Sequence, residues 1–171
     1  MKRAFIYKDE KSHKFWCIDY SGYDFSVNYG KSGSIGKFKI KEFETEEECL
    51  KQAEKLIRSK EKKGYVEDTG FDFMNKIYID SEEYGLHPKT SHPRFTEHFT
   101  EELYYDCVDE EAPFGSDEGS DTLDSLEETI RKNPKLNFPD YPKYLIEHDW
   151  GMEYIPVESL GPEVGKKLAS K

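Results

Sequence analysis

The sequence predicts an α+β protein: an N-terminal antiparallel sheet with one packed helix, followed by a mostly α-helical domain. Three observations predict this fold class. Short segments with period-two alternation fill the first part of the chain, one capped amphipathic helix pattern follows them, and helix-type patterns dominate the remainder. With 171 residues the chain is long enough to bury a core without disulfides or a structural metal.

Four segments have the pattern of half-buried strands, with aromatic or β-branched residues alternating with polar ones. They are residues 4–8, 15–20, 23–29 and 37–41. In residues 23–29 the alternation is strict, so four apolar or aromatic side chains face one way and three small polar ones face the other. We therefore expect four antiparallel strands.

A helix is predicted after the fourth strand. Thr45 stands three residues before Glu48, which is the spacing of a capping box, and Gly64 follows the last turn at the position that favours a left-handed residue. The expected buried stripe consists of Cys49, Leu50, Ala53, Leu56 and Ile57. Such a helix covers one face of the sheet.

Charge changes along the chain together with the pattern type. Residues 1–70 have a net charge of +2, residues 71–171 have −13, and the whole chain has −11. The whole-chain value excludes a uniformly basic nucleic-acid-binding protein. We predict two domains, 1–70 and 71–171, the second acidic and mainly helical, with a basic protein as its potential partner.

Three helical segments are expected in the second domain. The first begins at Thr100 and buries Leu103, Tyr104, Cys107 and Val108. The second begins at Ser120, or slightly earlier at Ser116, and ends at Asn133-Pro134, and a short third element covers residues 141–148.

The apolar content points to a cytoplasmic protein. No stretch approaches the ~20 apolar residues of a membrane span, and the N-terminal apolar run is too short for a signal peptide. The cysteines, Cys17, Cys49 and Cys107, lack metal-binding or redox spacing, so we expect small buried thiols. We expect no cofactor and no contact with a membrane.

Three stretches of the first domain resemble the WGR domain. They are Lys14-Phe15-Trp16-Cys17-Ile18, Tyr29-Gly30-Lys31-Ser32-Gly33-Ser34 and Lys62-Lys63-Gly64-Tyr65. The resemblance covers about residues 1–67 and implies a twisted antiparallel sheet with a packed helix. It also implies nucleic-acid binding, because this region of the poly(ADP-ribose) polymerases contacts DNA ends.

The name-giving tripeptide of that family is altered here. Tyr29 stands for the Trp and Lys31 for the Arg, while Gly30 is retained. Tyrosine keeps an aromatic face for stacking, but lysine offers a point charge in place of a planar bidentate fork. The resemblance therefore implies weaker nucleic-acid or phosphate binding through these residues.

The second domain is similar to the C-terminal part of small bacterial WGR-domain proteins of the YfeS type, whose function is uncharacterised. The matching stretches are residues 84–86, His92-Pro93, residues 102–109 and residues 112–119. The resemblance thus extends over most of the chain, but it implies no activity.

A basic stripe accompanies the altered tripeptide. The fourth predicted strand directs Phe38 and Ile40 inward and sends its lysines out on one face; these are Lys37, Lys39 and Lys41. The lysines are candidates for phosphate contacts. Alternating lysines on an edge strand also protect a sheet against edge-to-edge pairing, and this alternative stays open.

The remaining patterns favour structural roles. The loop after the third strand contains Gly30, Gly33 and Gly36. It has neither the following helix nor the Gly-Lys-Ser/Thr ending of a phosphate-binding loop, so we expect these residues to be turn glycines with positive φ. The acidic run 115–121 lacks the spacing of an EF-hand. His87, His92 and His98 match no metalloprotease motif.

The sequence therefore predicts a non-catalytic bacterial WGR-domain protein that binds nucleic acid or phosphate weakly. The predicted contact residues are Tyr29, Gly30, Lys31, Lys37, Lys39 and Lys41. A protein-interaction adaptor acting through the acidic domain is the alternative. A metal-dependent hydrolase that uses the histidines and acidic residues ranks last.

Overall fold

The computed structural model describes residues 1–80 and 85–156. The chain forms two compact units, Met1–Ser120 and Asp121–Lys171, each of which is described by itself. The predicted domain boundary at residue 70 stays a prediction. In the structure, the segment that follows residue 70 packs on the N-terminal sheet, within the first unit.

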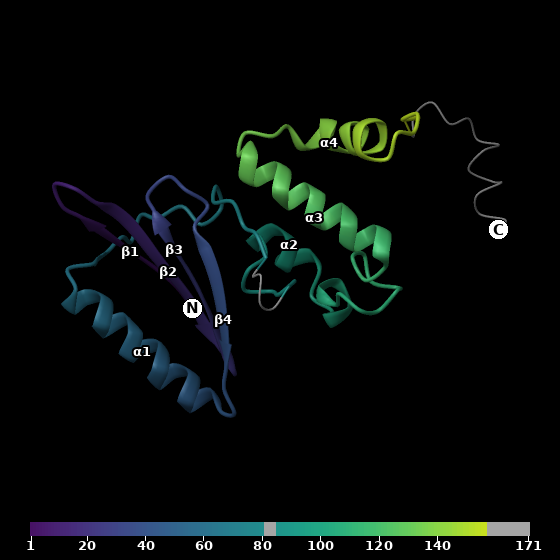
Figure 1. Cartoon of the computed structure of the whole chain (residues 1–171). Helices are drawn as coiled ribbons and strands as arrows, with labels where there is room; N and C mark the ends of the chain where they lie inside the picture. Colours follow the sequence, from purple (N-terminus) through teal and green to yellow (C-terminus); the bar gives the residue numbers. More distant parts are fainter. Residues whose placement is uncertain (81–84, 157–171) are drawn as a thin grey trace. The chain divides into compact units, whose positions relative to one another are not determined.

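The first unit is built on a five-stranded antiparallel sheet in the order β4-β3-β2-β1-β5 (Figure 1). The strands are β1 (Lys2–Lys8), β2 (His13–Ser21), β3 (Asp24–Lys31), β4 (Lys37–Glu42) and β5 (Val66–Glu67). The four predicted strands are confirmed. The sequence analysis missed β5, which has only two residues, too few to show an alternation.

The predicted helix is α1 (Glu46–Lys62), and both of its ends have the expected geometry. The Thr45 hydroxyl accepts a hydrogen bond from the Glu48 backbone N–H at 3.1 Å. At the other end Gly64 adopts φ +86°, and the Tyr65 N–H donates to the Lys60 carbonyl at 3.1 Å. These contacts form a Schellman motif, which ends the helix and turns the chain toward β5.

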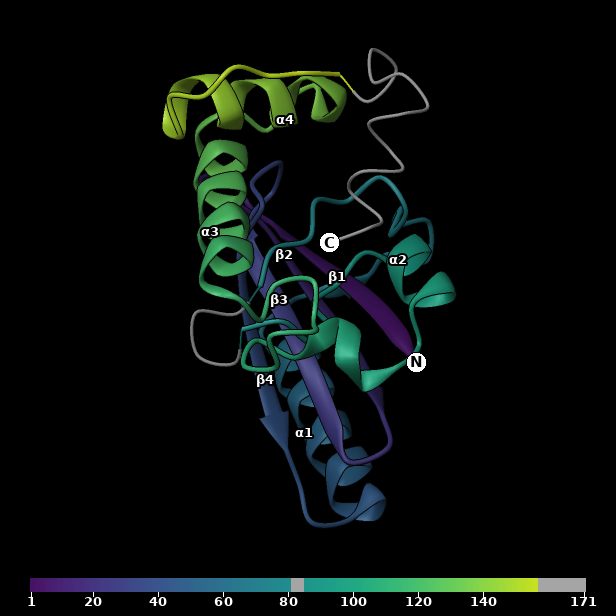
Figure 2. The ribbon, with the colours of Figure 1, turned by 90° about the vertical axis from the view of Figure 1, so that its right-hand side faces the viewer.

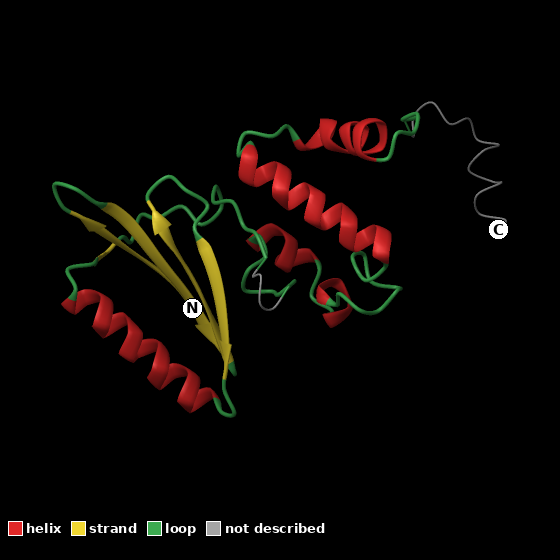
Figure 3. Ribbon diagram, viewed as in Figure 1, coloured by secondary structure: helices red, strands yellow, loops and turns green. Residues whose placement is uncertain are grey.

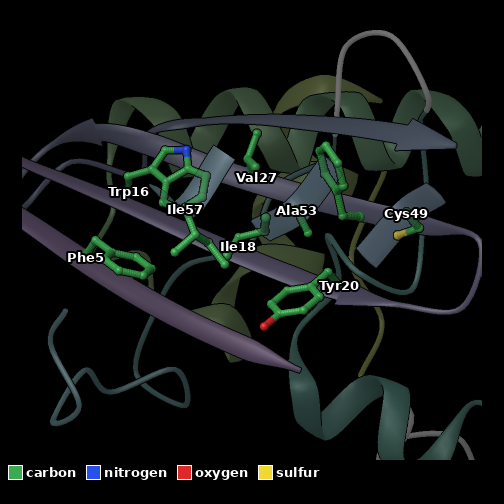
Figure 4. Close-up of a cluster of buried hydrophobic side chains, with 9 residues drawn as sticks. Phe5, Trp16, Ile18, Tyr20, Val27, Cys49, Ala53 and Ile57 are labelled. Atoms are coloured by element: carbon green, nitrogen blue, oxygen red, sulfur yellow. The ribbon is translucent and has the colours of Figure 1, made fainter. Parts of the chain in front are cut away.

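One face of the sheet packs against α1 (Figure 1). Phe5, Trp16 and Ile18 from the strands meet Ala53 and Ile57 from the helix, and all of them are almost completely buried (Figure 4). The predicted stripe is confirmed except at Leu50. Leu50 is 49% exposed, because it lies at the margin of the helix face.

The opposite face of the sheet is also covered. The chain after β5 crosses it mainly as loop (Figures 2 and 3), and Phe71 and Phe73 pack against Ala4, Phe15 and Cys17. Ser26 and Asn28 also face this side of the sheet and are only 4% exposed. We call residues 71–80 and 85–92 the strap. The small polar side chains of β3 are therefore buried beneath a second layer.

Beyond the strap, the first unit contains α2 (Pro93–His98) and a 3-10 helix at Glu102–Tyr105. The predicted helix from Thr100 to Val108 is wrong. The turn ends at Tyr105 because the Asp106 carboxylate accepts the backbone N–H groups of Val108 and Asp109, at 2.7 and 3.0 Å. Val108 and Cys107 are exposed, which corrects the expectation that all three cysteines are buried.

Helix α3 (Asp117–Lys132) leads into the second unit. The Ser116 hydroxyl accepts the Gly119 N–H at 3.1 Å, so the earlier of the two predicted start points is correct. Within the second unit, α4 (Tyr141–Tyr144) and a π-helical turn (Leu145–Asp149) occupy the predicted short element, and a 3-10 turn (Phe138–Asp140) precedes it. Ser125 joins α3 to this element through a 2.8 Å hydrogen bond to Asp149.

Candidate nucleic-acid interface

The altered tripeptide lies in an open hollow at one end of the sheet. There β2 begins and β3 ends, and antiparallel pairing places Lys14 opposite Lys31 and Trp16 opposite Tyr29. The C-terminal turn of α1 closes one side of the hollow. Its lining residues are Lys11, Ser12, His13, Lys14, Phe15, Tyr29, Gly30, Lys31, Lys60 and Tyr65, around a volume of about 510 Å³.

The side chains of the hollow combine cations with aromatic rings. Tyr29 is half-buried and packs against the apolar core between the sheet and α1, which holds its ring in place. The Lys60 ammonium lies 5.3 Å from the Trp16 ring centroid and 5.0 Å from that of Tyr65. Burial, followed by repulsion from neighbouring lysines, lowers the pKa of Lys60. This ammonium therefore favours an anionic ligand that neutralises the cluster.

No aspartate or glutamate of the described residues lines the hollow. The neighbouring β1–β2 turn carries two acidic residues, Asp9 and Glu10, of which Asp9 is engaged locally. Its carboxylate accepts hydrogen bonds from the Tyr7 hydroxyl at 2.7 Å and from the Lys11 backbone N–H at 2.8 Å. The Tyr7 hydrogen bond, first, and the Lys11 hydrogen bond, next, lower the pKa of Asp9. The hollow is thus locally basic on a chain of net charge −11.

The loop after β3 is held in one shape by hydrogen bonds and close packing. The Ser32 N–H donates to the His13 carbonyl at 2.9 Å, and the Ser34 hydroxyl donates to the Lys31 carbonyl at 2.7 Å. Gly33 and Gly36 have φ +84° and +80°, as predicted.

Gly30 does not have the predicted positive φ. It lies within β3, where a Cβ would meet the Cα of Gly36 at 2.9 Å. The loop folds back on the strand at this point and leaves no room for a side chain. Gly30 therefore permits a close approach of backbone to backbone, which fixes the position of Lys31 beside it.

The lysine stripe lies on β4, which is an edge strand of the sheet. Lys37 is paired with Tyr29, so these two side chains are cross-strand neighbours. Lys39 and Lys41 are paired with Val27 and Phe25, farther along the strand. All three lysines are exposed. Lys37 is thus a neighbour of one lining residue of the hollow, Tyr29, although it does not line the hollow itself, and the other two lysines lie farther along the edge.

The histidines have structural surroundings. His87 Nε2 lies 3.4 Å from the Asp24 carboxylate, and burial lowers the pKa of His87. His92 caps α2, because its Nδ1 accepts the Arg94 N–H at 3.1 Å. Within the described residues, no group of three His, Cys, Asp or Glu side chains could hold a metal ion.

Lys60 is a member of the hollow that the sequence analysis missed. It lies more than 25 residues beyond Lys31, and no local pattern links the two. Lys14 and Tyr65 belong to stretches that carry the WGR resemblance, but they were not predicted as contact residues. Only the pairing of β2 with β3 places Lys14 opposite Lys31.

The N-terminal part of the chain matches a known protein family. Residues 1–72 match the WGR domain family, so the chain carries a WGR domain at its N-terminal end.

In the part of the chain described, no helix is both long and apolar enough to cross a bilayer.

The chain is 61% identical to the uncharacterized protein YfeS of Escherichia coli (strain K12) over 160 residues, which make up 94% of this chain and 66% of YfeS. It is also 46% identical over 65 residues to the protein YehF of the same organism, and covers 24% of it. A crystal structure of a Bacteroides fragilis protein shares 44% identity over 48% of this chain and 25% of its own, with a TM-score of 0.39. The chain thus spans less than two thirds of the length of these relatives.

Proposed function

We propose that the WGR domain of this protein is a non-catalytic, cytoplasmic module that binds nucleic acid through the basic hollow. One observation carries the proposal: Lys14, Lys31 and Lys60 line the same hollow as Tyr29, and none of the described residues that line it is a carboxylate. Phosphates pair with lysines, and aromatic faces accept bases, in sites that bind nucleic acid without sequence preference.

The number of cations sets the strength of binding. The hollow offers three or four lysines, so a bound strand would release about as many counterions. The logarithm of affinity should then fall against the logarithm of salt concentration with a slope of roughly −2 to −3 for single strands. The net charge of −11 opposes the approach of any polyanion, so binding is confined to this local cluster.

Fluorescence anisotropy with labelled single- and double-stranded oligonucleotides at low salt tests the proposal. The 171-residue chain should bind with a dissociation constant in the range of roughly 1–100 μM. The double variant K14E/K31E should lose most of this affinity. In a matched control, K51E/K55E, the charges of two exposed lysines on the outer side of α1 are reversed. The net charge changes by the same amount as in K14E/K31E.

Equal losses in the two double variants would show that only net charge matters, which would overturn the assignment to the hollow. A third variant separates the lysine stripe from the hollow. Lys37 pairs with Tyr29 across the strands, so K37E should weaken binding more than K41E, which reverses the charge of a lysine farther along the same strand. Equal effects of K37E and K41E would contradict the proposal that binding is centred on the hollow.

A further inference from the structure

Two histidines of the strap, His87 and His92, bind the backbone in the same way. In each ring, Nδ1 accepts a hydrogen bond from the backbone N–H two residues later, which is that of Lys89 at 3.0 Å and that of Arg94 at 3.1 Å. For His92 this contact is also the N-terminal cap of α2. Each imidazole thus fixes a turn of the backbone through the lone pair of Nδ1.

The second ring nitrogen of each histidine reaches a different segment. His87 Nε2 lies 3.4 Å from the Asp24 carboxylate on β3, and His92 Nε2 lies 2.9 Å from the Met74 carbonyl oxygen. Both partners are acceptors, so Nε2 carries the ring proton and Nδ1 carries none. His87 therefore connects the strap to the sheet, His92 connects the two halves of the strap, and both rings are held as the same neutral tautomer.

The contacts of His87 coincide with the polar attachment of the strap to β3. The Lys89 ammonium pairs with the same Asp24 carboxylate, and the Lys89 carbonyl accepts the Ser26 hydroxyl at 3.0 Å. The backbone N–H of Lys89 is the group that His87 Nδ1 accepts. Loss of this one hydrogen bond would therefore loosen the residue that attaches the strap to the sheet.

A second proton on either ring removes an acceptor. It binds at Nδ1, where it meets the backbone N–H, so the hydrogen bond is lost and two donors face each other. Burial, the largest influence, lowers the pKa of His87, whereas Glu42 on β4 and Asp19 on β2 act in the opposite direction. Asp24 faces the same ring from β3, and the Lys89 ammonium beside Asp24 faces it from the strap.

Aromatic and cationic groups face His92. The Tyr78 ring lies edge-on to it, with 5.5 Å between the ring centroids. The ammonium groups of Lys76 and Lys2 lie 4.7 and 5.7 Å from the centroid of that Tyr78 ring. A positive charge on His92 would therefore be added beside a ring that already holds two cations.

We propose that His87 and His92 form an acid-sensitive latch, which holds the strap on the sheet at neutral pH and releases it when the imidazoles are protonated. In the open strap His87 regains its ordinary pKa of 6.5, so opening takes up a proton. The equilibrium therefore shifts toward the open strap as the pH falls below 6.5, by up to about tenfold for each pH unit. The latch does not depend on the proposed nucleic-acid binding.

Two buried cysteines can report which face of the sheet opens. Cys17 is 5% exposed and packs against Phe71 and Phe73 of the strap, and it lines the same small cavity as Lys89. Cys49 is 1% exposed and belongs to the core between the sheet and α1. Opening of the strap exposes Cys17 alone, whereas general unfolding exposes both.

Thiol labelling with 4,4′-dithiodipyridine, which reacts at acidic as well as neutral pH, tests the proposal on the 171-residue chain. The modified cysteines are identified by mass spectrometry, and each rate is divided by that of glutathione at the same pH. Between pH 7.5 and pH 5.0 the relative rate of Cys17 should increase at least about tenfold. The relative rate of Cys49 should not change.

A double variant removes the titration but keeps the acceptors. In H87N/H92N the asparagine side-chain oxygens can accept the same backbone N–H groups, but they do not take up protons in this pH range. The relative rate of Cys17 should then be the same at both pH values. The matched control H98N/H148N replaces two exposed histidines outside the latch and should behave like the wild type.

Three results would overturn the proposal. The first is a Cys17 rate in the wild type that is equally low at both pH values. The second is an equal increase of the Cys49 rate at pH 5.0, which would show general acid unfolding in place of a local opening. The third is an increase of the Cys17 rate in H87N/H92N as large as that in the wild type. The first two need no variant, so the proposal can fail even where the double variant is unstable.

Discussion

The two faces of the sheet are buried by different means. The α1 face holds Phe5, Trp16 and Ile18 against the helix, in a continuous apolar layer. The strap face carries a smaller apolar cluster and also buries Ser26 and Asn28, whose hydroxyl and amide N–H groups donate hydrogen bonds. The Ser26 hydroxyl donates to the Lys89 carbonyl at 3.0 Å, and the Asn28 amide donates to the carbonyls of Ile35 and Lys37, both at 3.2 Å.

The two faces therefore contribute differently to the free energy of unfolding of the first unit. An apolar layer gains free energy in proportion to the area that it buries. A polar layer gains little per hydrogen bond, but it loses much when a buried group is left unpaired. We therefore expect the α1 face to dominate the free energy of unfolding, while the strap face and the loop after β3 set local geometry.

The largest expected effect is truncation on the α1 face. Phe5 is completely buried, so F5A should lower the free energy of unfolding by about 3–5 kcal/mol. The matched truncation on the other face is F73A, which removes a half-buried ring and should cost about 1–2 kcal/mol. Urea denaturation followed by tryptophan fluorescence measures both. Equal losses would contradict the contrast between the two faces.

The next effect concerns the loop that carries Lys31. Gly36 has φ +80°, and a Cβ there would meet the Phe15 ring at 2.6 Å and the Tyr29 carbonyl oxygen at 2.9 Å. G36A should therefore cost about 2–4 kcal/mol. Gly33 has a similar φ but open space around it, so G33A should cost only about 1 kcal/mol. Thermal unfolding of both variants measures the two losses of stability. Because both glycines have a positive φ, the difference between the losses reports the steric clash at Gly36 alone.

The smallest effect is a pH dependence on the strap face. Lys76 has its ordinary pKa of 10.5 in the unfolded chain and a pKa of about 8 in the folded one, so folding is penalised while the amine is charged. The penalty is fully present below pH 8 and declines as the pH rises from 8 toward 10.5. Between pH 7 and pH 9, the stability of the wild type should rise by on the order of 1 kcal/mol relative to K76M.

This comparison is best made by chemical denaturation, with pH 9 as its upper limit. Above pH 9 the raised pKa of Cys17 acts in the opposite direction, because the unfolded thiol loses its proton first. A constant difference between wild type and K76M at pH 7 and pH 9 would show that Lys76 is not desolvated.

The elements of the sheet and α1 follow from local patterns, which explains why they could be predicted. The alternation of residues 23–29 and the Thr45 cap each involve neighbours in sequence, and the structure has both. The same alternation gives the wrong burial for Ser26 and Asn28, which it places on an exposed face. Small polar side chains alternate in the same way whether their face meets water or a second layer, so the strap could not be foreseen from β3.

The candidate site was predictable only in part, for a related reason. Tyr29, Gly30 and Lys31 were found through the WGR resemblance, and Lys37 through its alternation in the fourth strand. Lys60 reaches the hollow because α1 ends there, which depends on helix length and packing direction rather than on any motif. Sites assembled from separate elements require the fold before their members can be grouped.

The central claim is that nucleic acid binds in the hollow, and a titration followed by two-dimensional ¹H–¹⁵N NMR tests it most directly. On addition of a short single-stranded oligonucleotide at low salt, the largest amide shifts should fall on residues 11–14 and 29–34. Amides on the outer side of α1, such as those of Lys51 and Lys55, should stay in place. Shifts confined to β4 beyond Lys37 or to the second unit, or no shifts at all, would contradict the account.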